Sequence, residues 1–175
     1  MTSHSKQKQL PDIPGLNIHN NFQYGDLGKA LLFHGQVYNQ EYGFNHEFEA
    51  YVAGGLAEFA NNYIQGKSSL WIAECKDDII GSIAILERKN KQAQLRWFLV
   101  HPHYQGLSLG RYLFQEAIDF SRNAGYESIF LWTLDNLLAA KHIYEANGFR
   151  KEQKKKHFLW GRQLEELYYV LKLTK

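Results

Sequence analysis

The stretch LRWFLVHPHYQGLSLGR, residues 95–111, decides the fold of this chain. Its first half is aliphatic and aromatic as far as His101 and predicts a β-strand, and a turn follows at Pro102. The loop from Gln105 to Gly110 then leads directly into a helical pattern. A loop at a helix N-terminus presents several unpaired backbone N–H groups toward one point, backed by the positive end of the helix dipole. It can therefore bind a pyrophosphate without a lysine.

Two better-known nucleotide loops fit this stretch poorly. No Gly-Lys-Ser/Thr sequence follows, so it is not a P-loop, and only Gly106 and Gly110 are glycine. The preceding strand also belongs to an antiparallel pattern, which argues against a dinucleotide fingerprint. Taken alone, two glycines in a loop are usually an ordinary turn, and that alternative stays open at this point.

Hydrophobic periodicity around this stretch predicts a single α/β domain with a mixed sheet of about seven strands and four helices. The three middle strands should be antiparallel, with Gly81 at a bulge, and Asn45 should cap the second helix. Residues 1–14 are expected to be a flexible lead-in to a domain over residues 15–175. Strands are expected over 16–22, 70–75, 79–86, 93–101, 128–134, 149–160 and 165–172, and helices over 25–40, 47–62, 109–124 and 137–146.

Composition excludes several classes of protein. Hydrophobic residues make up 45% of the 175 residues, which is too apolar for a disordered chain. The net charge of +2 gives no reason to expect specific nucleic-acid binding or a membrane partner. The single cysteine, Cys75, suits a reducing compartment and should be a packed strand residue. Residues 1–9 are polar and lack the apolar core of a signal peptide, so none is expected there. The expected location is the cytoplasm.

The segment from Leu95 to Pro102, followed by Gln105 to Arg111, resembles motif A of the GNAT acetyltransferases. The loop of that motif reads Gln or Arg, two residues, Gly, one residue, then Gly or Ala. Gln105 and Gly110 match it, and Ser108 stands where the middle glycine usually is. Serine is small, and its hydroxyl could donate to a phosphate.

A second segment is similar to motif B of the same family. It comprises the strand from Ile129 to Thr133, the helix from Ala139 to Glu145, and the pair Gly148-Phe149. The two motifs in this order and separation are far more specific than either alone, and the resemblance covers residues from about 16 to 175. In detail the sequence looks closest to the acetyltransferase half of MarR–GNAT fusion proteins, without the DNA-binding half.

The resemblance implies a GNAT-like fold and an N-acetyltransferase. The amine of a small molecule or peptide would attack the thioester of acetyl-CoA directly, and no metal is expected. The partners would be acetyl-CoA or CoA and an amine acceptor, and a homodimer is left open. The pyrophosphate would bind the backbone of the loop, anchored by Leu107, Leu109 and Leu113, while the preceding strand would hold pantetheine. The implied cofactor-binding residues are Phe98, Leu99, Val100, Gln105, Gly106, Leu107, Ser108, Leu109, Gly110 and Arg111.

The resemblance also indicates the catalytic acid. Tyr144 stands four residues after Ala140, as the family's tyrosine does, and would protonate the leaving thiolate. The alternative is an aromatic core residue of a short helix. Family members often carry an asparagine seven residues before this tyrosine. Here Leu137 occupies that place, and its neighbour Asn136 could serve instead.

The general base is not identified by sequence. The family often has a glutamate on the fourth strand, where this chain has Gln94, which cannot accept a proton at neutral pH. Three residues of the first helical region, Glu41, His34 and Tyr38, are candidates for the base or for the acceptor wall, although a plain helix end is an equally good interpretation. A second function also stays open, namely a non-catalytic acyl-CoA sensor that partners a transcriptional regulator.

Overall fold

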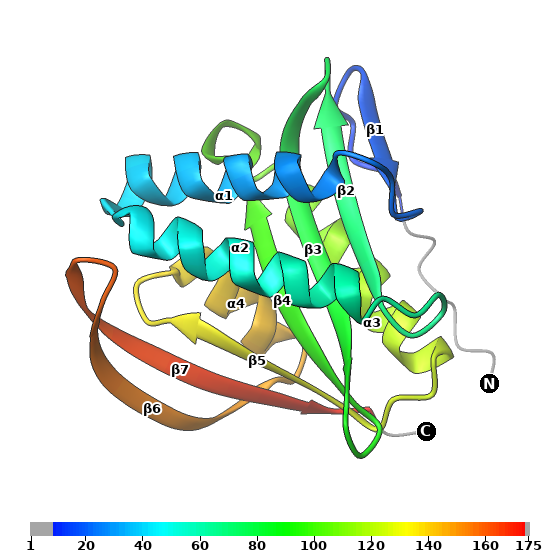
Figure 1. Ribbon diagram of the computed structural model, residues 1–175. Helices are drawn as coiled ribbons and strands as arrows, with labels where there is room; N and C mark the ends of the chain where they lie inside the picture. The colour runs from blue at the N-terminus through cyan, green and yellow to red at the C-terminus, as the bar shows by residue number, and fades with distance from the viewer. Residues whose placement is uncertain (1–8, 174–175) are drawn as a thin grey trace.

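The computed structural model describes residues 9–173 of the chain. Its elements follow the predicted order of strand, two helices, three strands, helix, strand, helix and two strands, so the predicted fold class is confirmed (Figure 1). The first strand ends at His19 rather than Phe22. The elements are β1 Leu16–His19, α1 Asp26–Tyr42, α2 His46–Asn61, β2 Ser69–Cys75, β3 Asp78–Arg88, β4 Gln92–Val100, a 3-10 turn Pro102–Tyr104, α3 Leu109–Asn123, β5 Ser128–Leu134, α4 Leu138–Ala146, β6 Arg150–Leu159 and β7 Arg162–Lys172.

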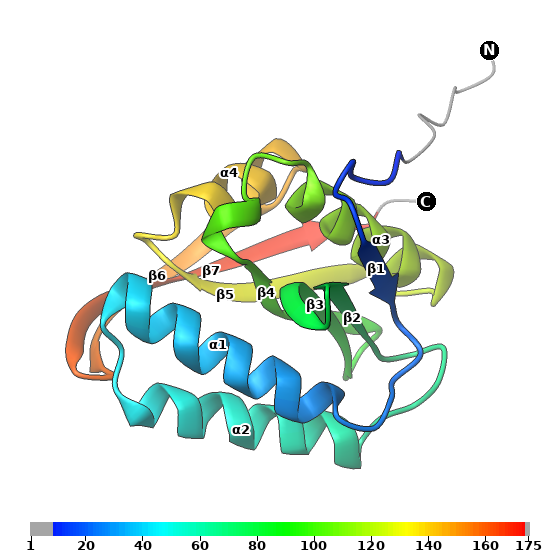
Figure 2. The ribbon, with the colours of Figure 1, turned by 90° about the horizontal axis from the view of Figure 1, so that it is seen from above.

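The strands form one sheet in the order β1-β2-β3-β4-β5-β7-β6. Helices α1 and α2 cover one face, and α3 and α4 cover the other, as the view along the sheet shows (Figure 2). Asn45 caps α2 as predicted, since its side chain accepts a hydrogen bond from the Glu47 backbone N–H.

The sheet parts between its two central strands. β4 and β5 are its only parallel neighbours among the described strands, and they pair only from Gln92 to Gln94 with Ser128 to Phe130. Beyond Gln94, β4 runs on to Val100 without pairing with β5. The C-terminal halves of the two strands are therefore not joined by backbone hydrogen bonds.

A bulge near the middle of β4 changes which face its side chains meet. Trp97 has a positive φ of 50°, and the β3 register shifts there between Ser82 and Ala84. The buried Ser82 hydroxyl donates to the Trp97 carbonyl oxygen at 2.7 Å and holds the bulge. Leu95 belongs to the core cluster on the α3 side, whereas Trp97 belongs to the cluster on the α1–α2 side. Strict alternation would place both on one face, so the bulge reverses the pattern.

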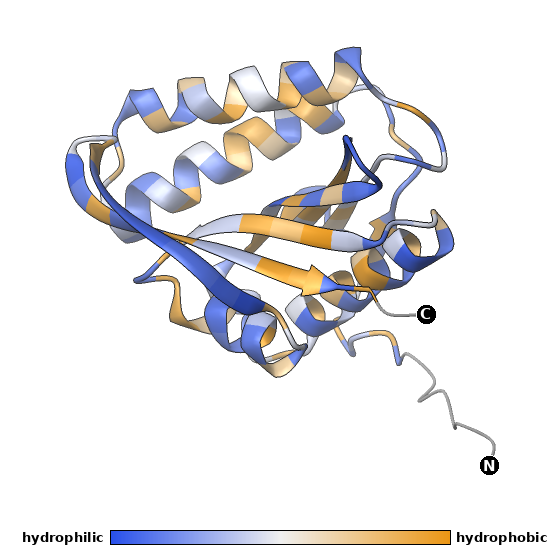
Figure 3. Ribbon diagram, turned by 90° about the horizontal axis from the view of Figure 1, so that it is seen from below, coloured by the Kyte–Doolittle hydropathy of each residue, from blue (hydrophilic) through white to orange (hydrophobic). Residues whose placement is uncertain are grey.

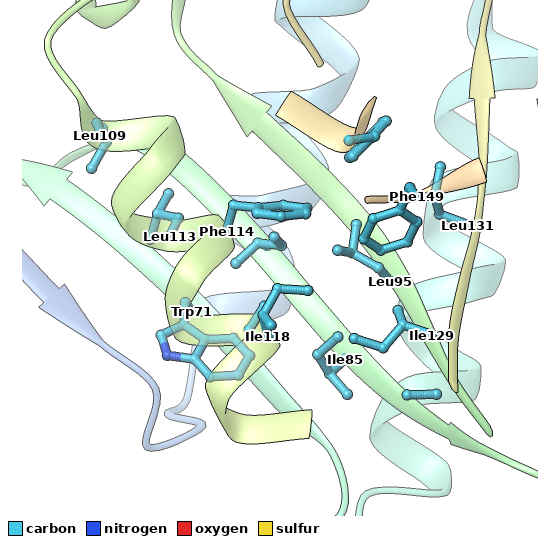
Figure 4. Close-up of a cluster of buried hydrophobic side chains, with 14 of the residues drawn as sticks. Trp71, Ile85, Leu95, Leu109, Leu113, Phe114, Ile118, Ile129, Leu131 and Phe149 are labelled. Carbon is cyan, nitrogen blue, oxygen red and sulfur yellow. The ribbon is translucent and has the colours of Figure 1, made fainter. Parts of the chain in front are cut away.

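The larger core lies between the sheet and α3 (Figure 4). Gly81 of β3 lies against this helix, since a Cβ atom there would come within 3.0 Å of the Leu113 side chain. The predicted bulge is present beside it, because Ala73 pairs with Gly81 while Glu74 pairs with Ile79. The residues predicted to face inward from α3 are all buried: Leu113, Phe114, Ala117, Ile118 and Ser121.

The predicted lead-in falls partly outside the described residues. Within them, Pro11 and Ile13 are buried, and Ile13 joins the larger core. The domain boundary at residue 14 stays a prediction. Cys75 is buried in the same core, as expected for a packed strand residue, and its thiol donates to the Pro14 carbonyl at 3.4 Å.

The edge of the sheet formed by β6, at the far end from β1, is strongly hydrophilic. Strand β6 is exposed over most of its length and stands out as a polar ribbon (Figure 3). Lys154 and Lys156 lie within 4.0 Å of Glu165 on β7. These charges discourage edge-to-edge pairing with another sheet. Within residues 9–173, no helix has the length and apolar character needed to cross a membrane.

Candidate active site

Two adjoining pockets open where β4 and β5 part. The first, here called the loop pocket, lies between the end of β4, the N-terminus of α3, α4 and the C-terminal end of α1. The second, the inner pocket, lies between β4, β5 and helices α1 and α2. They share four lining residues, Tyr38, Phe98, Leu137 and Ala140, so a molecule in one pocket can reach a molecule in the other.

The loop pocket ends at an uncapped helix N-terminus. Ser108 is the N-cap of α3 with a positive φ of 66°, and its side chain makes no capping hydrogen bond. The first backbone N–H groups of α3 have no preceding turn to bond, so they are available to an anion. Gln105 ties the loop to the strand by donating from Nε2 to the Val100 carbonyl at 3.2 Å.

Most of the predicted cofactor residues meet in this pocket. At Gly110 the start of α3 packs closely against the end of β4, because a Cβ atom there would lie 3.4 Å from the Val100 side chain and 3.5 Å from that of Phe98. Any larger side chain would therefore reduce the space next to the helix N-terminus. Eight of the predicted residues line the loop pocket: Phe98, Leu99, Val100, Gln105, Gly106, Ser108, Gly110 and Arg111.

Three predicted residues lie elsewhere. Leu107 is 47% exposed, so the expectation that it anchors the loop in the core is wrong; Leu109 and Leu113 do so, both fully buried. The loop turns Leu107 outward because the backbone reverses through positive φ values at Gly106 and Ser108. Asn136 is exposed and lines neither pocket, whereas its neighbour Leu137 lines both.

Tyr144 lies on the wall of the inner pocket, on α4. Its ring centroid is 6.0 Å from that of Phe98 and 5.8 Å from that of Phe114. Burial raises the pKa of the Tyr144 phenol well above its usual value near 10, and the neighbouring Tyr38 and Tyr169 act in the same direction. The hydroxyl therefore stays protonated at neutral pH and can act as a donor in the inner pocket, next to Phe98, which lines both pockets.

His34 lies on the α1 side of the inner pocket and is 2% exposed. Its Nδ1 donates to the Ala30 carbonyl at 2.8 Å, so Nε2 carries the free lone pair of the neutral ring. Burial lowers the pKa of His34 to about 4, and the nearby Arg96 also lowers it. His34 is thus a neutral hydrogen-bond acceptor at physiological pH.

The other candidates for the acceptor side differ in position. Tyr38 is buried on the wall shared by both pockets, and burial raises its pKa. Gln94 lines the inner pocket, where its Oε1 accepts a hydrogen bond from Arg88 at 3.0 Å. Glu41 is exposed and lines neither pocket. The structure therefore brings His34, Tyr38 and Gln94 together and leaves Glu41 outside.

Sequence reasoning missed most of the inner pocket. Arg96 and Trp97 lie in the strand predicted over residues 93–101 and are not among the predicted site residues, yet both line the inner pocket. Within residues 9–173, the buried side-chain nitrogen and oxygen atoms without a hydrogen-bond partner are His34 Nε2 and Trp97 Nε1, and both residues belong to this wall. Unpaired buried polar atoms are rare in folded proteins, and they frequently mark functional sites. The remaining aromatic residues of the wall are Phe48, Tyr51, Trp132 and Trp160.

Neither pocket contains a metal-binding set. Among the residues that the structure describes, no three His, Cys, Asp or Glu side chains gather where they could hold an ion. His101 and His103 lie close together, with ring centroids 5.0 Å apart, but no carboxylate or thiol joins them within that described part.

Comparison with known proteins gives a consistent family. The model of the acetyltransferase (GNAT) family matches residues 33–149. N-acetyltransferase family 8 member 2 of Rattus norvegicus is 29% identical over 101 residues, which are 55% of this chain and 45% of the relative. N-acetyltransferase 8B of Homo sapiens is 25% identical over 116 residues, 63% of this chain and 51% of the relative. The chain spans about half the length of the curated relatives it matches.

Solved structures share the fold over nearly the whole chain. A GNAT-family acetyltransferase from Staphylococcus aureus superposes with a TM-score of 0.76 at 20% identity, covering 91% of this chain and 99% of its own. An acetyltransferase from Streptococcus agalactiae gives 0.70 at 25% identity, with 92% and 100% covered. A Salmonella typhimurium protein described as an acetyltransferase, solved with its cofactor acetyl-CoA, gives 0.65 at 16% identity, with 92% and 95% covered.

Proposed function

This chain belongs to the GNAT acetyltransferase family, and we propose that it transfers an acetyl group from acetyl-CoA to an amine by direct attack of the amine on the thioester. One observation carries the proposal: the loop pocket and the inner pocket meet at the parting of β4 and β5. A thioester placed at this junction would face both the α3 N-terminus and the inner pocket. Two reactants held together in this way gain greatly in effective concentration.

The loop pocket fits a CoA molecule. The uncapped N–H groups of α3, with Gly106 and Gly110 beside them, would receive the pyrophosphate. The main chain of β4 from Phe98 to Val100, which is free of a β5 partner, would bind the pantetheine arm. The loop pocket is also the larger, about 270 Å³ against about 110 Å³ for the inner pocket, as expected for a long arm opposite a single amine.

The inner pocket would then hold the acceptor. His34 Nε2 would accept a hydrogen bond from the neutral amine and orient its lone pair toward the thioester. Because the pKa of His34 is about 4, His34 cannot hold the proton of an ammonium at pH 7, and this proton passes to water before attack. The new C–N bond forms as the C–S bond breaks, and the amine's second proton is lost to solvent.

Tyr144 would complete the reaction. Its hydroxyl stays protonated and would donate its proton to the departing thiolate, after which solvent reprotonates the phenolate. The raised pKa makes Tyr144 a weaker acid than a free phenol, so its positioning at the junction must supply most of the effect.

The alternative of a non-catalytic acyl-CoA sensor for a transcriptional regulator has no observation in its favour, and the relatives matched carry the name N-acetyltransferase. The likeness to MarR–GNAT fusions, the cytoplasmic location, the absence of specific nucleic-acid or membrane partners and the open homodimer stay predictions.

The proposal is tested by turnover. Purified protein is incubated with acetyl-CoA and a panel of polyamines, amino acids, aminoglycosides and peptides, and free CoA is measured with a thiol reagent. We expect CoA release above the uncatalysed rate with at least one amine, together with the acetylated product by mass spectrometry. CoA binding by calorimetry without turnover on any amine would replace the enzyme with a sensor.

A further inference from the structure

Arg96 is a cation without an anionic partner. Within residues 9–173, the contacts of its guanidinium are with aromatic rings, and no carboxylate or other acceptor forms an ion pair or hydrogen bond with it. It is half-buried on the wall of the inner pocket. An arginine has five N–H donors, and in such a position they ordinarily find acceptors.

The fold holds this guanidinium in place. Its Cζ atom lies 5.3 Å from the ring centroid of Tyr51 and 4.8 Å from that of Trp97. Trp97 is available for this contact because the β4 bulge turns it to the α2 side of the sheet. Gly55 of α2 provides the space for the guanidinium, since a Cβ atom there would come within 2.8 Å of both terminal guanidinium nitrogens. Two aromatic faces and a glycine thus fix the cation before any ligand arrives.

The charges of the pocket fit a single negative group. The other ionised residue of the lining is Glu166, and the His157 imidazole lies 3.1 Å from its carboxylate. His34 is neutral, and the remaining polar lining residues, Gln94 and Thr133, carry no charge. A lining with one arginine and one glutamate suits a carboxylate better than a phosphate, which usually requires several donors.

We propose that Arg96 binds the carboxylate of the acceptor, so that the acceptor is an amine that also carries a carboxylate. An α-amino acid with an aromatic or aliphatic side chain fits best, because most of the remaining lining residues are aromatic or aliphatic. This inference rests on the proposed acetyl transfer. It makes Arg96 a binding residue for the acceptor and gives it no part in the chemical step.

The first test uses the wild-type protein and acceptors that differ only in the carboxylate. L-Phenylalanine is compared with phenethylamine and with L-phenylalanine amide, and L-leucine with isopentylamine, at saturating acetyl-CoA. We expect kcat/KM to be at least about tenfold higher for the amino acids, a typical effect of one charge-assisted hydrogen-bonded contact. The 1-aminophosphonate analogue of phenylalanine should be used less well than the amino acid.

The second test removes the guanidinium. Arg96→Gln should lower kcat/KM for the amino acids about 10- to 100-fold, mainly through KM, and leave the decarboxylated amines within about twofold. Arg96→Lys should restore part of the preference. Arg122→Gln makes the same change at an exposed position of α3 that lines neither pocket, and should leave both series unchanged. Circular dichroism checks that each variant is folded.

The outcomes separate this inference from the proposed function. Equal use of amino acids and decarboxylated amines by the wild type would overturn the role of Arg96 while leaving acetyl transfer standing. The same holds if the phosphonate is preferred, or if folded Arg96→Gln keeps the full preference. The wild-type comparison decides the matter even if Arg96→Gln does not fold. An absence of turnover with every amine would remove the proposed function and this inference together.

Discussion

The two pockets of this protein are built in opposite ways. About half of the residues that line the loop pocket belong to one continuous segment, from Phe98 to Arg111, and the rest come from α1 and from α4 with the residue before it. The inner pocket is made by side chains from α1, α2, β4, β5, α4 and the β6–β7 hairpin. The first pocket presents peptide N–H groups that any sequence with the right turn would supply. The second depends on which side chain stands at each position, so under the proposed function it would set the choice of acceptor, while the first would hold the cofactor.

The largest effect is expected at Tyr144, where the proposed function places the proton donor for the leaving thiolate. Tyr144→Phe keeps the ring and its packing and removes only the hydroxyl, so acetyl-CoA should still bind with unchanged affinity. Turnover should fall about 10²- to 10⁴-fold, the range for loss of a positioned acid. Tyr169→Phe is the matched control, since Tyr169 is buried in the same cluster but donates to Glu145 and lines neither pocket. Normal turnover by Tyr144→Phe would mean that the proton comes from water.

The loop pocket alone should respond to a change at Gly110. Gly110→Asp adds a carboxylate beside the helix N-terminus and fills space 3.4–3.6 Å from Val100, Phe98 and Ile143. Affinity for CoA should fall at least about 100-fold, because an unpaired negative charge would face the phosphates. Gly28→Asp, near the start of α1 with open space around it, serves as control. Unchanged CoA affinity by calorimetry in folded Gly110→Asp would contradict the assignment of this pocket.

Of the two pockets, the inner one should make the stability of the protein depend on pH, through His34. Burial lowers the pKa of His34 from its ordinary value near 6.5 to about 4 in the folded chain, so between these values the unfolded state binds more protons. Stability should therefore fall as the pH drops from 6.5 to 4, by up to about 3 kcal/mol from this residue, and level off below. Urea unfolding of wild type and His34→Asn at several pH values measures the difference. Equal slopes in the two proteins would exclude His34 as the cause.

The smallest effect concerns the β4 bulge. Ser82→Ala removes the hydroxyl that donates to the Trp97 carbonyl and should cost about 1–2 kcal/mol of stability. Ser121→Ala is a matched change, because Ser121 is buried and donates to the Ala117 carbonyl at 2.8 Å, away from both pockets. Both variants should lose similar stability in urea unfolding, but only Ser82→Ala should also raise KM for the acceptor. A rise of similar size in Ser121→Ala would show that the KM follows stability and not the bulge.

The same contrast explains what the sequence could predict. The loop pocket was predictable because Gln105, Gly106 and Gly110 follow a strand and open a helix within one short stretch. The prediction that Leu107 anchors the loop was wrong because the residues on both sides of it, Gly106 and Ser108, have positive φ, which turns Leu107 outward. Helix and strand order was predictable for a similar reason, since periodicity is a local property of the chain.

The inner pocket was not predictable from sequence alone. Arg96 stands in a strand where alternation gives no hint that it and Trp97 meet the same helices, and the bulge that causes this leaves no glycine in the sequence. Nothing in the sequence indicates that Gly55 of α2 lies against the Arg96 guanidinium, where a Cβ atom would clash. His34 was a candidate by residue type, but its burial and its bond to Ala30 follow from packing between α1 and the sheet.

The parting of β4 and β5 also affects how the molecule holds together. Its two backbone ladders, β1 to β4 and β5 with β7 and β6, are joined along a seam from Gln92 to Gln94. Few backbone hydrogen bonds therefore join the two ladders, and the core that both share beneath α3 supplies most of the contact between them. A ligand that contacts Val100 on one side and Ile143 on the other bridges the gap that the hydrogen bonds leave. Substrate binding and the cohesion of the two ladders are then coupled, so a protein saturated with its ligand unfolds as a more cooperative unit than the free chain.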